Sequence, residues 1–349
     1  MKEFSPIIFK DGQLSLLDQR KLPVEENFIH CNTLEDGFKA IKDMVVRGAP
    51  CIGYSAIFSL ALWLKNNKYD SKEFKKACLF LKGARPTAVN LAFEVDKVYS
   101  LCENLHDCED ENIFYKEVVE FGFLQLRESE SNNRAMARFA HEELKDRYKN
   151  KKLNILTHCN TGFLACGSIG TALGVIQYLG EQKLIENVWV DETRPYLQGS
   201  RLTAYELTKL EIPHKIVVEG AASHLMSSGL VDAIFVGADR IVSNGDTANK
   251  IGTASLSIIA KYYNIPFYVV APKSSFDIDS NSGDEIEIEL RPESEITNYR
   301  DNQISPLTSE AFNPSFDITS GINITGIICE QKCLKPPYLK SIKEIFNGN

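Results

Sequence analysis

Residues 231–253 read VDAIFVGADRIVSNGDTANKIGT, and the interpretation of the chain starts from them. The apolar run 234–236 has the character of a buried strand, and 253–263, TASLSIIAKYY, is typical of a helix. The segment between them is rich in charged and amide side chains: Asp239, Arg240, Asn244, Asp246, Asn249 and Lys250. Because ligands of an open α/β sheet bind outside the carboxyl ends of its strands, this stretch predicts a site for a small polar ligand. The alternative is that Asp and Asn only form the turn and cap the helix.

The composition is that of an ordinary globular protein. Of the 349 residues, 44% are hydrophobic and 25% are charged. A chain of this length suffices for one large domain or two. The net charge is −8 and the pI about 5.4, and no block of Lys and Arg interrupts this acidic balance. Nucleic-acid binding depends on clustered cations that neutralise phosphates, so we expect no nucleic-acid partner.

The sequence predicts neither export nor membrane insertion. Its first residues, MKEFSPIIFKDG, lack the pattern of a secretory signal, and the apolar stretch 49–64 is too short for a membrane span and favours a buried helix. The nine cysteines, an odd number, are therefore expected to be reduced thiols in the cytoplasm. Cys329 and Cys333 lie four apart, but no second pair with metal-ligand spacing accompanies them, which disfavours zinc.

Residues 1–128 are expected to form a smaller, mostly helical N-terminal domain with short strands at its start. Asp11-Gly12 is a hairpin signal, and Thr33 and Asp36 have the spacing of a helix capping box. One helix is expected to begin near Ile113 and another near Asn132. Residues 129–152, which end in the polar run KDRYKNKK, are expected to connect this domain to the next.

Two turns of this domain carry an arginine beside a helix end. They are RGAP at 47–50 and ARPTAVN at 84–90, where a helix is expected to begin at Thr87. Arginine next to free backbone amides commonly holds phosphate oxygens, so Arg47 and Arg85 are candidates for a phosphate site. The alternatives are a helix C-terminus with a favourable cation at Arg47 and a solvated surface charge at Arg85.

From Leu153 onward, strand-like and helical segments alternate. The five strand-like runs are 153–159, 186–192, 214–220, 231–237 and 266–272. This alternation predicts an α/β fold with a Rossmann-like parallel sheet in a C-terminal domain at 153–349. One helix is expected over 163–179. The glycines there do not form the G-x-G-x-x-G fingerprint and no P-loop motif occurs, so no nicotinamide dinucleotide is predicted.

Polar side chains follow several of these strands. Because parallel strands bring their carboxyl ends to one edge of a sheet, five side chains are expected to face one crevice: Cys159, Gln198, Asp239, Asn249 and Lys250. The Cys159 thiol would precede a helix N-terminus, where the macrodipole stabilises a thiolate; the alternative is a small buried cysteine. His158 is not expected to act as its base, because neighbours along a strand point to opposite faces.

These groups together suit proton transfer on a sugar phosphate. Aldose–ketose isomerisation needs a group that moves protons, and it needs a firmly held phosphate that places the reacting carbons. The sequence contains neither a metal-ligand cluster nor a histidine with the partners of a catalytic triad. An isomerase of sugar phosphates is therefore the reaction class that the residues favour.

The same residues lie in long motifs that resemble the S-methyl-5-thioribose-1-phosphate isomerases. The motifs are RGAP at 47–50, ARPTAVN at 84–90, LTHCNTG at 156–162, DETRPYLQGSRLTAYEL at 191–207 and VGADRIVSNGDTANKIGT at 236–253. The similarity covers nearly the whole chain, from LLDQ at 16–19 to NPSFDIT at 313–319.

The resemblance implies a homodimeric isomerase of methionine salvage. It would convert S-methyl-5-thioribose 1-phosphate to S-methyl-5-thioribulose 1-phosphate with neither a metal nor a nucleotide cofactor. The resemblance further implies that Asp239 is the general acid and that the Cys159 thiol stabilises the transition state. The implied contacts to the sugar and its phosphate are Arg47, Gly48, Ala49, Arg85, Gln198, Asn249 and Lys250.

Two other functions remain open. Residues 219–222, EGAA, stand where members of the family tend to carry an Asp-Asn pair, which leaves open an isomerase of 5-deoxyribose 1-phosphate with the same catalytic set. The fold is also shared with regulatory subunits of a eukaryotic translation-initiation exchange factor, which are interaction proteins. The simultaneous presence of Cys159, Asp239, Arg47 and Arg85 favours the enzyme, since an interaction protein has no physical need for all four.

Overall fold

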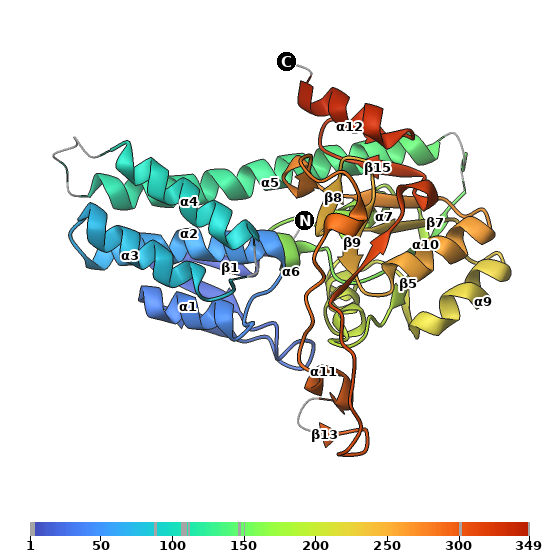
Figure 1. The fold of residues 1–349 in the computed structure, drawn as a ribbon, viewed down its shortest axis with the longest axis horizontal. Coiled ribbons are helices and arrows are strands. Elements are labelled where there is room, and N and C mark those ends of the chain that lie inside the picture. Colours follow the sequence, from blue (N-terminus) through green and yellow to red (C-terminus); the bar gives the residue numbers. More distant parts are fainter. Residues whose placement is uncertain are drawn as a thin grey trace. The chain divides into compact units, whose positions relative to one another are not determined.

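The computed structural model describes residues 4–86, 89–105, 110, 112–145, 148–149, 151–299 and 302–347 (Figure 1). The chain divides into two compact units. The first contains residues 1–131 and 162–170, and the second contains 132–161 and 171–349.

The first unit opens with a three-stranded antiparallel sheet. Its strands are β1 (Ile7–Lys10), β2 (Gln13–Leu17) and β3 (Phe28–Cys31). Asp11 and Gly12 join the first two strands with φ angles of 52° and 71°, the left-handed conformation that a two-residue hairpin turn needs. The hairpin predicted from this dipeptide is therefore confirmed.

Helices complete this unit: α1 (Leu34–Lys42), α2 (Ala49–Asn66), α3 (Ser71–Lys82), α4 (Val89–Glu103) and the four-residue α6 (Phe163–Cys166). The capping box is confirmed, since the Thr33 hydroxyl accepts from the Asp36 amide at 3.2 Å and the Asp36 carboxylate accepts from the Thr33 amide at 3.1 Å. Helix α2 lies in the hydrophobic core, as its apolar sequence predicts. None of the described helices combines the length and apolarity that crossing a membrane requires.

A single helix, α5 (Ile113–Lys145), replaces the two helices expected near Ile113 and Asn132. It continues from the first unit into the second at Ser131 and Asn132. The expectation of two helices was wrong because the polar run 127–133, RESESNN, contains neither Pro nor Gly, and residues such as Glu and Arg favour helix even without an apolar face.

The second unit is built on a seven-stranded sheet. The five predicted strands are confirmed as β4 (Leu153–Thr157), β5 (Ile185–Asp191), β6 (His214–Val217), β7 (Ala233–Val236) and β10 (Phe267–Val270). Two further short strands are β15 (Gly326–Ile328) and β16 (Cys333–Leu334), and the order is β16-β15-β10-β7-β4-β5-β6. Only β16 pairs antiparallel, so the sheet is mixed and the predicted α/β, Rossmann-like class is confirmed.

This strand order places a topological switch point between β4 and β7. From β4 the chain proceeds to β5 and β6 on one side of the sheet, and it then returns to β7 and continues through β10 to β15 on the other side. The ends of β4 and β7 therefore border the crevice in which doubly wound sheets bind their ligands.

The helices of this unit are α7 (Ala172–Glu181), α8 (Ala204–Lys209), α9 (Ala222–Ser227), α10 (Thr253–Tyr262), α11 (Ser294–Thr297) and α12 (Tyr338–Asn347). Alternate residues of the strands enter two cores on opposite faces, with Ile155 and Phe235 in one and Leu156 and Ile234 in the other. The helix expected over 163–179 is broken into α6 and α7, because Gly167 takes a φ of 89° that cannot continue a helix.

A second, four-stranded sheet contains residues 240–250. Its strands are β8 (Arg240–Val242), β9 (Thr247–Lys250), β11 (Phe276–Asp277) and β14 (Phe316–Thr319), in the order β11-β8-β9-β14. The segment expected to be a loop is thus a hairpin. A two-stranded ribbon, β12 (Asn298–Tyr299) with β13 (Asn302–Gln303), belongs to the same unit. Short turns of π or 3-10 helix lie at Gly199–Thr203, Glu219–Ala221, Lys273–Ser275, Gly283–Glu285 and Gly321–Asn323.

Candidate active site

Three neighbouring strands carry the predicted chemistry at their carboxyl ends. Thr157, the last residue of β4, pairs with Phe235 of β7 on one side and with Val190 of β5 on the other. Its hydroxyl also donates to the carbonyl of Phe235 at 2.8 Å. Cys159 follows β4, Gln198 lies in the loop after β5 and Asp239 follows β7, so all three belong to the strand ends at the switch point.

Cys159 is held in an uncommon backbone conformation. Its φ is 67°, a left-handed value that non-glycine residues seldom adopt. Two side chains fix it, since its amide donates to the Thr193 hydroxyl at 2.9 Å and its carbonyl accepts from the Thr203 hydroxyl at 2.7 Å. Backbone strain that the surroundings impose in this way is typical of functional residues. The helix after Cys159 is only the four-residue α6, so the expected support from a helix macrodipole is small.

Gln198 lies against the thiol. Its side-chain amide donates to the sulfur of Cys159 at 3.3 Å, and the residue is only 1% exposed. Its carbonyl oxygen, Oε1, has no hydrogen-bond partner among the described residues. An unsatisfied buried acceptor costs about 1–3 kcal/mol, so this oxygen is well suited to accept a hydrogen bond from a ligand.

The loop that holds Gln198 depends on a close approach of two backbone segments. A Cβ atom on Gly199 would lie 1.7 Å from the carbonyl oxygen of Asp191, which no side chain can tolerate. Glycine at this position therefore lets the loop fold back on the end of β5 and presents Gln198 to Cys159.

The six polar residues of 239–250 divide into two groups. Asn244 and Asp246 form the hairpin turn, with the Asn244 side-chain amide donating to Asp246 at 2.8 Å, and Arg240 pairs with Asp277 at 3.4 Å. The side chains of these three residues bond within the protein, as the alternative of turn-forming and structural residues expects. The remaining three are the ones that the family resemblance marks.

Asp239, Asn249 and Lys250 have different environments. Asp239 is exposed between β7 and β8, and its amide donates to the carbonyl of Ala248 at 2.9 Å. Asn249 is buried and donates to the Thr253 hydroxyl at 3.0 Å. The Lys250 ammonium donates to the carbonyl of Ser315 at 2.7 Å. The exposed Asp239 and the partly buried Lys250 thus lie at the same end of the hairpin that β8 and β9 form.

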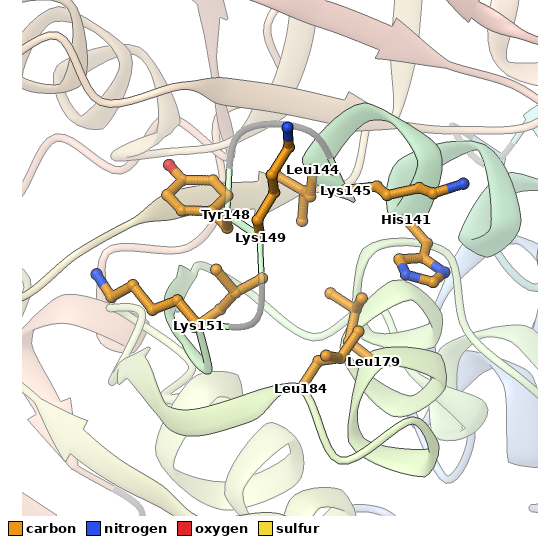
Figure 2. Close-up of a pocket in the computed structure, with 9 residues that line it drawn as sticks. His141, Leu144, Lys145, Tyr148, Lys149, Lys151, Leu179 and Leu184 are labelled. Carbon is orange, nitrogen blue, oxygen red and sulfur yellow. The ribbon is translucent and has the colours of Figure 1, made fainter.

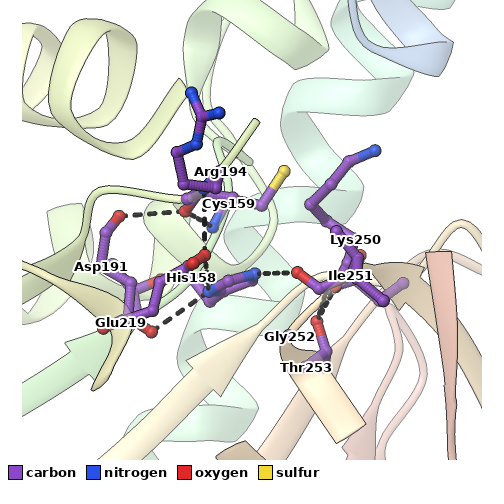
Figure 3. A network of polar contacts seen from close by, with 12 residues as sticks. His158, Cys159, Asp191, Arg194, Glu219, Lys250, Ile251, Gly252 and Thr253 are labelled. Carbon is purple, nitrogen blue, oxygen red and sulfur yellow. Dashed lines mark hydrogen bonds and ion pairs between the residues drawn. The ribbon is translucent and has the colours of Figure 1, made fainter. Parts of the chain in front are cut away.

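A buried histidine lies directly below Cys159, although sequence reasoning gave it no role (Figure 3). The His158 Nδ1 is 3.1 Å from Oδ2 of Asp191 and 3.9 Å from Oε1 of Glu219, and its Nε2 donates to the carbonyl of Ile251 at 2.9 Å. Burial acts to lower its pKa, but the hydrogen bond and charge of Asp191, with smaller contributions from Cys159 and Glu219, raise the pKa to about 9. The feature of the sequence that could have indicated this histidine is Asp191, the acid at the carboxyl end of strand 185–191.

A second acid was also missed. Asp317, which pairs with Asn249 across β9 and β14, accepts from the amides of Gly252 at 2.7 Å and Ala254 at 3.0 Å. It therefore caps the first turn of α10. Burial raises its pKa, and the two amide hydrogen bonds oppose that effect. The capping residue is distant in the sequence, so local capping patterns in the sequence do not predict it.

In the first unit, the predicted arginines precede two helices. Gly48, with a φ of 89°, is the N-cap of α2, so Arg47 lies at a helix N-terminus and the alternative of a helix C-terminus was wrong. Arg85 precedes α4, but Thr87 and Ala88 lie outside the described residues. A Cβ on Gly53 of α2 would lie 3.5 Å from the carbonyl of Asn90, so the starts of α2 and α4 pack together.

Two neighbouring helix N-termini, each preceded by an arginine, form an arrangement suited to an anion. The first amides of a helix lack intrahelical partners and carry partial positive charge, and a guanidinium adds a full charge with a planar set of donors. Among the described residues, no three His, Cys, Asp or Glu side chains are grouped so that they could hold a metal ion.

A cavity of about 360 Å³ lies at the opposite edge of the main sheet, where β4 and β5 begin (Figure 2). Leucines form its floor, and Lys145, Lys149 and Lys151 lie at its rim; Lys145 pairs with Glu142 and Lys151 with Asp232. Because ligands of doubly wound sheets bind at the carboxyl ends of the strands, this cavity is separate from the candidate active site.

The fold and the site together define a doubly wound α/β protein with a candidate small-ligand site at its switch point. The family model "Initiation factor 2 subunit family" matches residues 45–336. A methylthioribose-1-phosphate isomerase from Thermoanaerobacter sp. (strain X514) is 44% identical over 99% of this chain and 100% of that protein.

Two solved structures are similar over almost the whole chain. The 5-methylthioribose 1-phosphate isomerase from Pyrococcus horikoshii OT3 has a TM-score of 0.92 and 37% identity, covering 99% of this chain and 96% of that one. A translation initiation factor eIF-2B subunit delta from A. fulgidus has a TM-score of 0.89 and 35% identity, covering 99% of both chains. The chain therefore belongs to the initiation factor 2 subunit family, among its methylthioribose-1-phosphate isomerases.

Proposed function

We propose that this protein is an aldose–ketose isomerase that converts S-methyl-5-thioribose 1-phosphate to S-methyl-5-thioribulose 1-phosphate in methionine salvage. The observation that carries the proposal is the strained Cys159, with Gln198 bonded to its sulfur, at the switch point that also carries Asp239. The Gln198 Oε1 beside it has no hydrogen-bond partner in the part of the chain that the structure describes. The full-length similarity to methylthioribose-1-phosphate isomerases supports the substrate.

The roles of the second unit follow from the chemistry of each group. Asp239, an exposed acid, protonates the ring oxygen of the sugar so that the ring opens. Cys159 then assists the movement of a proton from the second carbon to the first. Asn249 and Lys250 donate to sugar hydroxyl and phosphate oxygens, and the Gln198 Oε1 accepts from a sugar hydroxyl. The reaction needs no metal and no nucleotide cofactor in this scheme.

The phosphate is assigned to the arginine turns of the first unit. Arg47, Gly48, Ala49 and Arg85 supply guanidinium groups and helix N-terminal amides, which support phosphate binding. In this proposal residues 1–128 form a phosphate-binding domain, 129–152 connect it, and 153–349 form the catalytic domain.

We further propose that the protein is a cytoplasmic homodimer that binds neither nucleic acid nor membranes. Large apolar side chains on the segment after β13 support self-association, since Leu307 is 89% exposed and Phe312 is 75% exposed. Large apolar side chains with this degree of exposure are candidates for contact sites between proteins. Sedimentation analysis with Leu307→Glu and Phe312→Glu tests this proposal, and a wild-type monomer at micromolar concentration contradicts it.

One observation bears on the runner-up substrate, 5-deoxyribose 1-phosphate. The Glu219 carboxylate accepts from the Arg194 amide at 3.1 Å and lies close to His158. Glu219, the first residue of the EGAA sequence at 219–222, therefore bonds within the protein and belongs to the network around His158. The second alternative, a non-catalytic regulatory subunit, is motivated by the likeness to the eIF-2B subunit delta.

The deciding experiment compares kcat/KM on 5-methylthioribose 1-phosphate and 5-deoxyribose 1-phosphate side by side. We expect a strong preference for the first substrate. Equal or reversed preference assigns the protein to 5-deoxypentose salvage. No isomerase activity on any 5-modified pentose 1-phosphate, with a correctly folded protein, would leave the regulatory function as the better account.

A further inference from the structure

We infer that His158 is a positioning residue of the active site, whose ring ties the strand end that carries Cys159 to the turn that carries Lys250. The inference rests on the proposed isomerase function. All the contacts that support it lie within the second unit.

The ring bonds fix the form of the histidine. Nε2 lies 2.9 Å from the carbonyl oxygen of Ile251, which can only accept, so Nε2 carries a hydrogen. Nδ1 lies 3.1 Å from the carboxylate of Asp191. A doubly protonated imidazolium satisfies both contacts, and the pKa of about 9 agrees with this form at neutral pH.

Several titratable groups face this ring from the surrounding elements. They are Asp191 from β5, Glu219 from the turn after β6, Asp317 from β14 and the adjacent thiol of Cys159. One oxygen of Asp191, Oδ1, has no hydrogen-bond partner among the described residues. A cation at His158 offsets this concentration of acids, which is costly to bury uncompensated.

The turn after β9 is held from two sides. On one side the residue before β14 fixes it, because the Ile251 amide and the Lys250 ammonium both donate to the carbonyl of Ser315, at 3.1 and 2.7 Å. On the other side His158 bonds to the Ile251 carbonyl, and its ring packs against Gly252, where a Cβ would lie 2.9 Å from Cε1. Gly252 has a φ of 104°, so glycine is required on both counts.

The consequence for the site is geometric. Figure 3 shows the side chains of Cys159 and Lys250 pointing the same way, away from the imidazole that lies beneath them. Without the bond from His158, the turn keeps its link to β14 but loses its link to the strand end of Cys159. A displacement of about 1 Å between catalytic and binding groups can cost about 100-fold in rate.

Three variants test the inference. His158→Leu removes both ring bonds, and we expect kcat/KM to fall about 100-fold. His158→Gln restores one donor toward Ile251 and should recover about tenfold of that loss. Asp191→Asn leaves a neutral histidine that still donates to Ile251, so its activity at pH 7 should stay within about threefold of wild type. His30→Leu, on the exposed strand β3, is the control and should behave as wild type.

A pH profile separates positioning from general stability. Above pH 9 the wild-type ring loses its Nδ1 hydrogen and faces the Asp191 carboxylate with a lone pair, so activity should decline; Asp191→Asn should lack this decline. The 15N resonances of the His158 ring should report an imidazolium at pH 7 in wild type and a neutral ring in Asp191→Asn.

The outcomes are distinguishable. A folded His158→Leu variant with wild-type kcat and KM overturns the inference. If that variant does not fold, a wild-type 15N spectrum at pH 7 in which the His158 Nε2 carries no hydrogen overturns it, because the bond to the Ile251 carbonyl then cannot form. The spectrum needs no substrate, so a wild type without isomerase activity contradicts the proposed function and leaves the test of His158 in place.

Discussion

The side-chain amide of Gln198 donates a hydrogen bond to the sulfur of Cys159 across 3.3 Å. This contact joins the ends of β4 and β5, the two strands that follow one another in the chain and lie side by side in the sheet. The second polar atom of the same amide, Oε1, has no hydrogen-bond partner among the described residues and can accept a hydrogen bond from a ligand. Gln198 thus connects the reactive thiol with substrate binding.

The first prediction concerns the thiol. Cys159→Ser should lower kcat about 100-fold or more, because a hydroxyl is far harder to ionise and less polarisable than a thiol. Steady-state kinetics measures the effect. Cys333→Ser, at the sheet edge in β16, is the control and should keep the wild-type kcat. Near-normal turnover in Cys159→Ser would remove the thiol from the mechanism.

The second prediction concerns the acid. Asp239→Asn keeps the shape of the side chain but cannot protonate the ring oxygen, so kcat should fall about 1,000-fold while the substrate still binds. Titration calorimetry with substrate and steady-state kinetics separate the two effects. Asp284→Asn, on an exposed turn, should leave both unchanged. If Asp239→Asn keeps its kcat, another group is the general acid.

The third prediction concerns the phosphate. Arg85→Ala should raise KM by about 10- to 100-fold with a smaller change in kcat, because one charge-assisted contact contributes about 1.5–3 kcal/mol. Arg127→Ala, whose guanidinium pairs with Glu120 on the surface of α5, is the matched control and should leave KM unchanged. If Arg85→Ala changes neither KM nor kcat, the phosphate assignment is wrong.

Local patterns in the sequence predicted the elements that such patterns determine. The alternation of apolar runs and helices predicted the five central strands, and Asp11-Gly12 and Thr33 with Asp36 predicted a hairpin and a capping box. The break at Gly167 and the hairpin at 240–250 were not predicted. Helical periodicity does not report a single glycine with positive φ, and a hairpin this rich in polar residues has the composition of a loop.

The residues of the candidate site were predictable where they directly follow a strand. Cys159 and Asp239 stand at strand ends, so the sheet order alone brings their backbones to neighbouring positions. The partners of His158 come from three separate segments, at 191, 219 and 251, and no local spacing connects them. Likewise, the cap of α10 comes from Asp317, far along the chain.

The fourth prediction concerns the close backbone approach at Gly199, with Gly220 of the same unit as the control. Gly199→Ala places a methyl group against the carbonyl oxygen of Asp191, so the loop must move, and we expect a loss of about 3 kcal/mol in unfolding free energy together with reduced kcat. Gly220→Ala adds the same methyl group where no atom lies within 4 Å, and it should be neutral. Chemical denaturation and kinetics of both variants test this. Equal stability of the two variants contradicts the close approach.

The fifth prediction is a pH dependence of stability. The folded-state pKa of His158 is raised from 6.5 to about 9, because its bond to Asp191 outweighs the effect of burial. Between these values the folded state binds a proton that the unfolded state has lost, so the stabilisation is complete below pH 6.5 and is lost as the pH rises through 9. The loss should be of the order of 3 kcal/mol, at about 1.4 kcal/mol per pKa unit. His158→Gln has no such proton, so the free energy by which wild type exceeds this variant should shrink from pH 6.5 to 9 in urea unfolding experiments. Parallel stability curves for the two proteins over that interval would show that His158 is not protonated in the folded state.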